Sequence, residues 1–91
     1  MDNRAKMEAM DKMLRELEDL KNSQTSLLKK VAQIEADNMN ANVALLDEEL
    51  PDVHERADAT VETITSLIEK LQNHRDEFVK KYNLDVPEET V

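Results

Sequence analysis

An uninterrupted heptad pattern constrains the fold of this chain more than any other feature of its sequence. Apolar or amide side chains recur at alternating spacings of four and three residues over positions 13–45. Such a repeat places its members along one side of an α-helix and is typical of a helix that packs against another helix. The members are Met13, Leu17, Leu20, Gln24, Leu27, Val31, Ile34, Asn38, Ala41 and Leu45.

The composition supports an all-helical fold. The chain has 91 residues, with no glycine, one Phe, one Tyr and no Trp. Without glycine, tight hairpin turns lose their usual backbone conformation, and without large aromatic rings the core must be built from aliphatic side chains. We therefore predict a single all-α domain, in which two long helices form an antiparallel helical hairpin that self-associates as a coiled coil or four-helix bundle.

The helix boundaries follow from proline and from the end of the heptad. A first helix is expected over about 4–46, because no helix breaker precedes Pro51. Pro51 suits the first position of a second helix over about 51–82, which leaves 47–50 as the connection. Asn83 can adopt the left-handed conformation that closes a helix, and 83–91 is expected to be a flexible tail.

The residue types within the heptad favour parallel pairing. With Leu17 at position a, leucine occupies position d at Leu20 and Leu27, while Val31 and Asn38 occupy position a. A buried Asn38 would hydrogen-bond to its symmetry mate in a parallel dimer and fix the register, unless it lies at an exposed edge of the bundle. The predicted oligomer interface is Met13, Leu17, Leu20, Gln24, Leu27, Val31, Ile34, Asn38 and Leu45.

A second apolar stripe in the back half of the first helix predicts contact with the second helix. A connection at 47–50 would place residues whose numbers sum to about 98 side by side, with Leu28 near Leu71 and Met39 near Ala59 or Thr60. The predicted hairpin-packing residues are Leu28, Met39, Val43, Leu46, Val61, Ile64, Leu67, Ile68, Leu71 and Phe78.

The formal charge of −9 is concentrated in the second half of the chain. A surface of this sign repels phosphate backbones and anionic lipid, so we expect neither direct nucleic-acid binding nor membrane binding. A run of acids could instead form a docking face for a basic protein, although acids at a helix start are more often simply solvated. These acids are Asp47, Glu48, Glu49, Asp52, Glu55, Asp58 and Glu62.

The side chains that usually support catalysis or cofactor binding do not form a recognisable motif. There is no cysteine, and His54 with Asp58 supplies only two potential metal ligands on one helix face. His74 falls between Leu71 and Phe78, where partial burial would make assembly sensitive to mildly acidic pH. We therefore expect no enzyme activity, cofactor or metal. The terminal Glu89-Thr90-Val91 departs from the commonest pattern read by carboxylate-capturing domains.

The expected function is non-enzymatic association of helices. The chain would act as a scaffold or adaptor, with a second copy (a dimer being favoured) or a related helical subunit as its partner. The alternative is a small acidic inhibitor or chaperone that binds a basic protein client through residues 47–62. Because the longest apolar run is Val43 to Leu46 and the N-terminus lacks the apolar core of a signal peptide, we expect a soluble intracellular protein, with the cytoplasm favoured.

Overall fold

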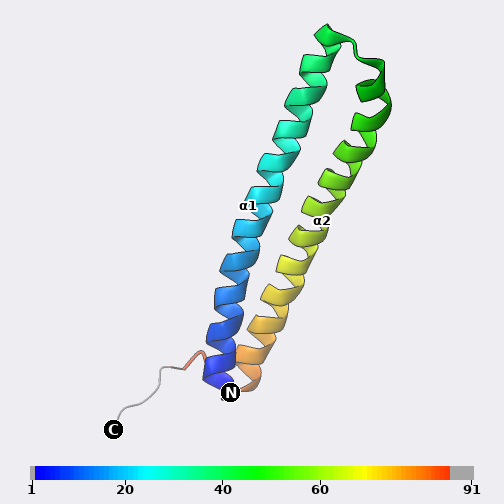
Figure 1. Ribbon diagram of the computed structural model, residues 1–91. Helices are drawn as coiled ribbons and strands as arrows, with labels where there is room; N and C mark the ends of the chain where they lie inside the picture. Colours follow the sequence, from blue (N-terminus) through cyan, green and yellow to red (C-terminus); the bar gives the residue numbers. More distant parts are fainter. Residues whose placement is uncertain (1, 87–91) are drawn as a thin grey trace.

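Two long antiparallel helices make up the molecule (Figure 1). The computed structural model describes residues 2–86, and over these residues α1 spans Asn3–Ala41 and α2 spans Ala44–Lys81. The helices pack side by side to give a rod of 71 × 18 × 18 Å. The predicted all-α hairpin is therefore confirmed.

Side-chain and backbone caps set the two ends of α1. At its start, the Asp2 carboxylate accepts a hydrogen bond of 2.7 Å from the backbone N–H of Ala5. At its end, Asn42 takes the left-handed conformation (φ 58°, ψ 44°), and its backbone N–H donates to the carbonyl of Asn38 at 2.7 Å. Asparagine adopts this conformation more easily than other residues with a side chain, so a chain without glycine can still turn here.

The connection is shorter and earlier than predicted. It consists of Asn42 and Val43, whereas the sequence analysis placed it at 47–50 between helices over 4–46 and 51–82. Pro51 lies inside α2 and does not begin it. A proline removes one helical hydrogen bond but does not have to end the helix, and here the left-handed Asn42 decides where the chain reverses.

Asn83 closes α2, as predicted. It has a positive φ of 52°, and the N–H of Leu84 reaches back to the carbonyl of Val79 at 2.9 Å. This six-to-one hydrogen bond, with the longer one from Asn83 N–H to Lys80 (3.4 Å), is the pattern of a Schellman motif. The terminal Glu89-Thr90-Val91 lies outside the described residues.

The core is a narrow seam between the two helices. Its buried apolar side chains are Met10, Leu14, Val31, Ala57, Ile64 and Val79, and among the described residues no side chain is less than 2% exposed. On α1 the buried and half-buried positions follow spacings of three and four from Met10 through Leu14, Leu17, Lys21, Gln24, Leu28, Val31 and Glu35 to Asn38. A heptad repeat therefore does face α2. It keeps Leu17, Gln24, Val31 and Asn38 of the predicted heptad, but its other row is Met10, Leu14, Lys21, Leu28 and Glu35.

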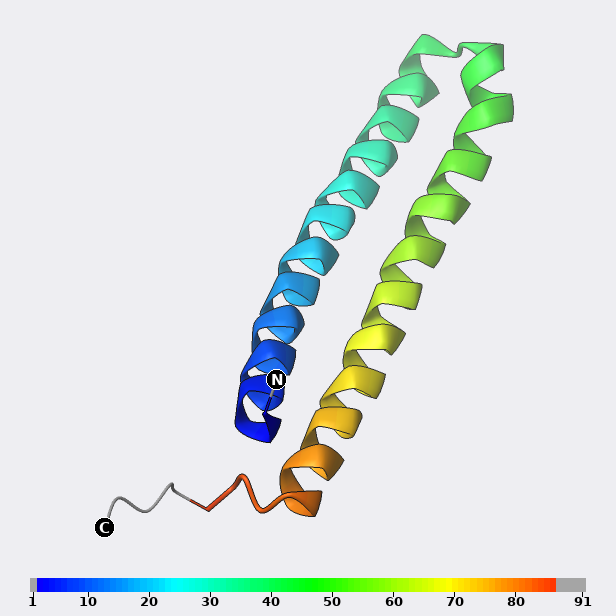
Figure 2. The same cartoon turned by 60° about the horizontal axis from the view of Figure 1, so that its bottom comes forward.

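Contacts across the seam fix the register of the two helices. Asp11 pairs with Arg75, Glu35 with His54, and Asn38 with Asp47. Opposite positions therefore have numbers that sum to about 87, which corrects the predicted sum of about 98 and the predicted Leu28–Leu71 neighbours. Figure 2 shows that the helices remain side by side from the turn to the start of α1 and the end of α2.

Candidate helix-association surface

The two rows of the predicted heptad have different fates in the structure. The a row turns toward α2: Val31 and Asn38 are buried, and Leu17 and Gln24 are half-buried. In the d row, Met13, Leu20, Leu27 and Ile34 remain 44–49% exposed, and Ala41 is exposed as well. Because α2 already covers the a row, an intact parallel two-stranded seam of α1 with a copy of itself is not available.

The exposed d row forms one face of the hairpin together with side chains of α2. Met13, Leu17 and Leu20 line a groove whose other wall is Leu67 and Leu71. Leu67 is 48% exposed, and Val53, fourteen positions earlier on the same helix, is 47% exposed. Positions seven or fourteen residues apart keep the same side of a seam with alternating spacings of three and four.

We call this surface the open face. It consists of Met13, Leu20, Leu27, Ile34, Val53 and Leu67.

The register places the open-face residues of the two helices at matching heights. With opposite positions summing to about 87, Leu20 lies level with Leu67, and Ile34 lies level with Val53. Leu27 is level with Thr60 in the same way. Apolar side chains therefore come at intervals of seven residues, or about 10 Å, along the rod.

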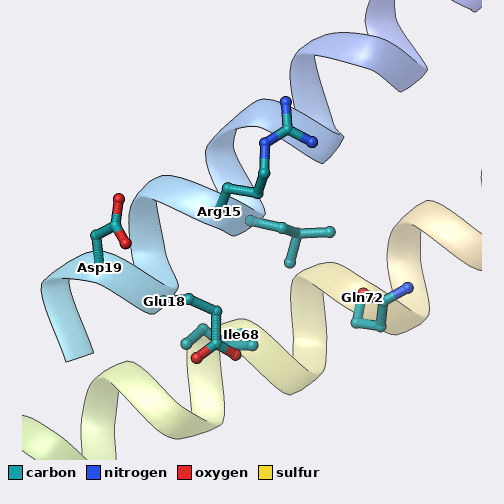
Figure 3. A pocket seen from close by; sticks show the side chains of 6 residues that line it. Arg15, Glu18, Asp19, Ile68 and Gln72 are labelled. Atoms are coloured by element: carbon teal, nitrogen blue, oxygen red, sulfur yellow. The ribbon is translucent and has the colours of Figure 1, made fainter. Parts of the chain in front are cut away.

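The other side of the hairpin is polar by comparison. Leu14 and Ile68 form the floor of a shallow recess there, and its rim is made of charged and amide side chains. In Figure 3 the Glu18 carboxylate lies over Ile68, while Arg15 and Asp19 extend away from α2. Long charged side chains can cover apolar atoms in this manner and keep their charge in water. On the open face, Glu16 lines one edge of the groove and Glu62 and Lys70 lie beside Leu67, yet Leu20 and Leu67 are still 44% and 48% exposed.

Asn38 is buried, but its partner differs from the predicted one. Its side chain is 4% exposed, and its Oδ1 accepts a hydrogen bond of 2.9 Å from the backbone N–H of Val43. Its Nδ2 donates to the Asp47 carboxylate at 2.8 Å and to the Val43 carbonyl at 3.3 Å. The amide therefore fixes the turn of its own chain, and a symmetry mate in a dimer is not needed to satisfy it.

The predicted hairpin-packing residues divide into two groups. Ile64 is buried, and Leu28, Leu46, Val61, Ile68, Leu71 and Phe78 are half-buried. Met39 was predicted wrongly, since it is 84% exposed beside the turn, and Leu67 belongs to the open face. The error at Met39 comes from the misplaced connection, whereas Leu67 lies in an apolar stripe of α2 that is broader than the part α1 covers. Val43 is the exposed N-cap of α2, and Leu45, assigned to the oligomer interface, is exposed in its first turn.

All seven acids of the predicted docking face are exposed. They lie on α2 close to the turn, and two of them have partners: Asp47 accepts from Asn38, and Asp52 binds Arg56 at 3.0 Å. The Asp52–Arg56 pair is the i, i+4 pairing of neighbours on a helix surface, which contributes little to stability when exposed.

The two histidines differ in their surroundings. His54 Nδ1 lies 2.6 Å from the Glu35 carboxylate and joins the two helices, a contact that the sequence analysis missed. His74 is exposed, which corrects the expectation of partial burial between Leu71 and Phe78. Within residues 2–86, no cluster of three or more His, Cys, Asp or Glu side chains has the geometry to hold a metal ion.

An ion pair near the chain termini was also missed. Arg75 Nε donates to Asp11 Oδ1 at 2.8 Å and Nη2 donates to Asp11 Oδ2 at 3.3 Å, so the guanidinium binds the carboxylate with two donors. These hydrogen bonds raise the pKa of Arg75 above its already high ordinary value. Arg75 lies four residues after Leu71 and three before Phe78, which places it in the seam. This spacing is the sequence signal that could have predicted a contact of Arg75 with α1.

The comparisons with known proteins and the search for a membrane span were both negative. Over the described residues, neither helix has an apolar stretch long enough to cross a bilayer. No protein-family model matches this sequence, and no curated protein or solved structure is significantly similar to it.

Proposed function

We propose that this chain is a non-enzymatic helix-association module, a scaffold or adaptor that docks a helical partner on the open face. The observation that carries the proposal is the open face itself, with six large apolar side chains 44–49% exposed on one side of the hairpin. Contiguous apolar surface of this kind marks a protein interaction site more often than an isolated exposed leucine does.

The weakness of the seam supports the same conclusion. Two helices of about 40 residues each bury only six apolar side chains between them, and none of these is fully enclosed. Long helices derive most of their stability from packing of an apolar face. Covering the open face would enclose the half-buried positions Leu17 and Leu71, which line the groove beside it.

An open-face variant tests the proposal. Ile34→Asp places a charge in the centre of the association surface, where desolvation would oppose docking. The wild-type chain is expected to exceed its monomer mass of 10.5 kDa by light scattering, and the variant to fall toward that mass with its helix content unchanged. Ala32→Asp is the matched control, because it adds the same charge at an exposed α1 position outside the open face.

A monomeric wild-type chain would require a second measurement. Immobilised wild type and Ile34→Asp would each be incubated with native extract at about 1 M salt, where the Debye length is about 3 Å. A protein retained by the wild type and not by the variant supports docking on the open face. A wild-type chain that neither self-associates nor retains a protein in this way contradicts the proposed function.

A second candidate function is capture of a basic protein by the acids near the turn. The supporting observation is that all seven are exposed, including those without a hydrogen bond to α1. Salt separates the two candidates. Acidic capture should weaken strongly as ionic strength rises, whereas association through the open face should persist.

A further inference from the structure

We propose that the partner on the open face is a second copy of this hairpin, stacked with its turn against the chain termini of the first copy. The product is a four-helix bundle in which the two turns lie at opposite ends. This inference rests on the proposed function, and it adds the identity and the orientation of the partner.

The open face is complementary to itself under a two-fold rotation. Its four levels lie at Met13, Leu20, Leu27 and Ile34 of α1. At the same heights α2 carries His74, Leu67, Thr60 and Val53, of which Leu67 and Val53 are apolar. A two-fold axis across the rod, midway between Leu20 and Leu27, would set level 13 of one copy against level 34 of the other. It would also set Leu20 against Leu27. Each of these apolar residues of α1 then meets another one, as an isologous interface requires, while on α2 Val53 meets His74 and Leu67 meets Thr60.

The size of the open face suits a dimer of hairpins. From Met13 to Ile34 it extends about 30 Å along the helix axis, and the hairpin is 18 Å across. The resulting strip is on the order of 500 Å² in projection, and its accessible area is larger because side chains project from it. Specific interfaces bury about 800 Å² on each partner, so nearly the whole face would be used.

The distribution of charge selects the orientation. The turn half, residues 24–63, has three basic and nine acidic side chains, a net charge of −6. The terminal half, residues 2–23 and 64–86, has nine basic and ten acidic side chains, a net charge of −1. Stacking with both turns at the same end would bring the two strongly negative halves together. Stacking with the turns at opposite ends sets each strongly negative half against a nearly neutral one.

Individual charges at the edge of the face do not choose between the two orientations. Glu16 lines the groove at the α1 edge, and it would face Lys30 of the second copy in one orientation and Lys70 in the other. Exposed pairs of this kind contribute at most about 1 kcal/mol. The net charge of the two halves is therefore the deciding difference.

Labels placed at the turn distinguish the orientations directly. The chain has no cysteine, so Asn40→Cys introduces a unique attachment site at an exposed position beside the turn. With turns at opposite ends, spin labels on the two copies should lie about 50 Å apart; with turns at the same end they should lie within about 25 Å. The distance would be measured by pulsed electron paramagnetic resonance on a sample shown by light scattering to be dimeric.

A cross-link gives an independent readout. Ser23 is exposed and lies next to the proposed two-fold axis, so Ser23→Cys in one copy should meet Ser23→Cys in the other and react with a short thiol cross-linker. In the same-end arrangement these positions occupy diagonal corners, and Ser23→Cys would instead cross-link to Thr63→Cys in a mixture of the two variants.

The outcomes separate this inference from the proposed function. A dimer with the long label distance and a Ser23→Cys homodimer supports the inference. A dimer with the short distance overturns the proposed orientation while open-face association stands. A monomer at all concentrations overturns the inference. The proposed function then fails as well, unless wild type and not Ile34→Asp retains another protein.

Discussion

The a row and the d row of α1 alternate within one heptad pattern but have opposite surroundings. Val31 of the a row is buried against α2, whereas Ile34, three residues later in the d row, is 46% exposed. Both rows lie within one regular heptad, but α2 approaches α1 on the side of the a row. It therefore also covers Leu14 and Leu28, which lie on the side of the a row away from the d row. The comparison teaches that a heptad predicts which side chains are available for packing and does not assign them to one partner.

Charge substitution in the two rows should separate folding from association, and this is the largest expected effect. Val31→Asp buries a carboxylate without a partner, which should lower the free energy of unfolding by more than about 3 kcal/mol. Ile34→Asp should leave the hairpin helical and change only the mass of the oligomer measured in solution. Urea unfolding followed by circular dichroism measures the first effect, with Ala32→Asp as the control. Equal loss of helix in the Val31→Asp and Ile34→Asp variants would contradict the assignment of the a row to folding and the d row to association.

Removing the buried amide at the end of the a row should have the next largest effect. Asn38→Ala leaves the Val43 N–H and the Asp47 carboxylate without their partner, at a cost of about 1–3 kcal/mol in the free energy of unfolding. Because these bonds lie within one chain, the loss should be the same at every protein concentration. A loss that grows on dilution would show instead that Asn38 acts between copies, as the sequence analysis expected.

The smallest expected effect concerns the ion pair between Asp11 of α1 and Arg75 of α2. Arg75→Met keeps the aliphatic bulk but loses the two hydrogen bonds to Asp11, and should lower the free energy of unfolding by less than about 1 kcal/mol because the pair is partly exposed. The raised pKa of Arg75 means that its contribution is lost only as pH rises through that high value. The difference from wild type should therefore be equal at about pH 6 and pH 9. Thermal melts at both values test this.

The fold class could be predicted from the sequence because it depends on patterns that extend over many residues. Helix formers without glycine, together with heptad spacing, are sufficient to indicate two long helices. The exact reversal point could not be predicted, because Pro51 is the stronger signal in the sequence and Asn42 is the residue that turns the chain. Since a helix can continue through a proline, the residue with the strongest helix-breaking tendency is not always the residue at which the helix ends.

The candidate surface could be predicted only in part. Met13, Leu20, Leu27 and Ile34 were assigned to an interface from spacing alone, and in the structure they are 44–49% exposed. The contribution of Val53 and Leu67 depends on the register of α2, which follows from the turn. The error of five residues in the connection also explains Met39, which was expected opposite Ala59 or Thr60 and lies beside the turn.

Among residues 2–86 no side chain is less than 2% exposed, and this has a consequence for how the hairpin responds to heat and denaturant. The heat capacity of unfolding and the denaturant m-value both scale with the surface that unfolding exposes, and a thin two-helix seam hides little of it. We therefore expect a hairpin without a partner to unfold with a small m-value and a small change in heat capacity. Covering the open face adds to the hidden surface, so assembly would sharpen the transition and make its midpoint rise with protein concentration.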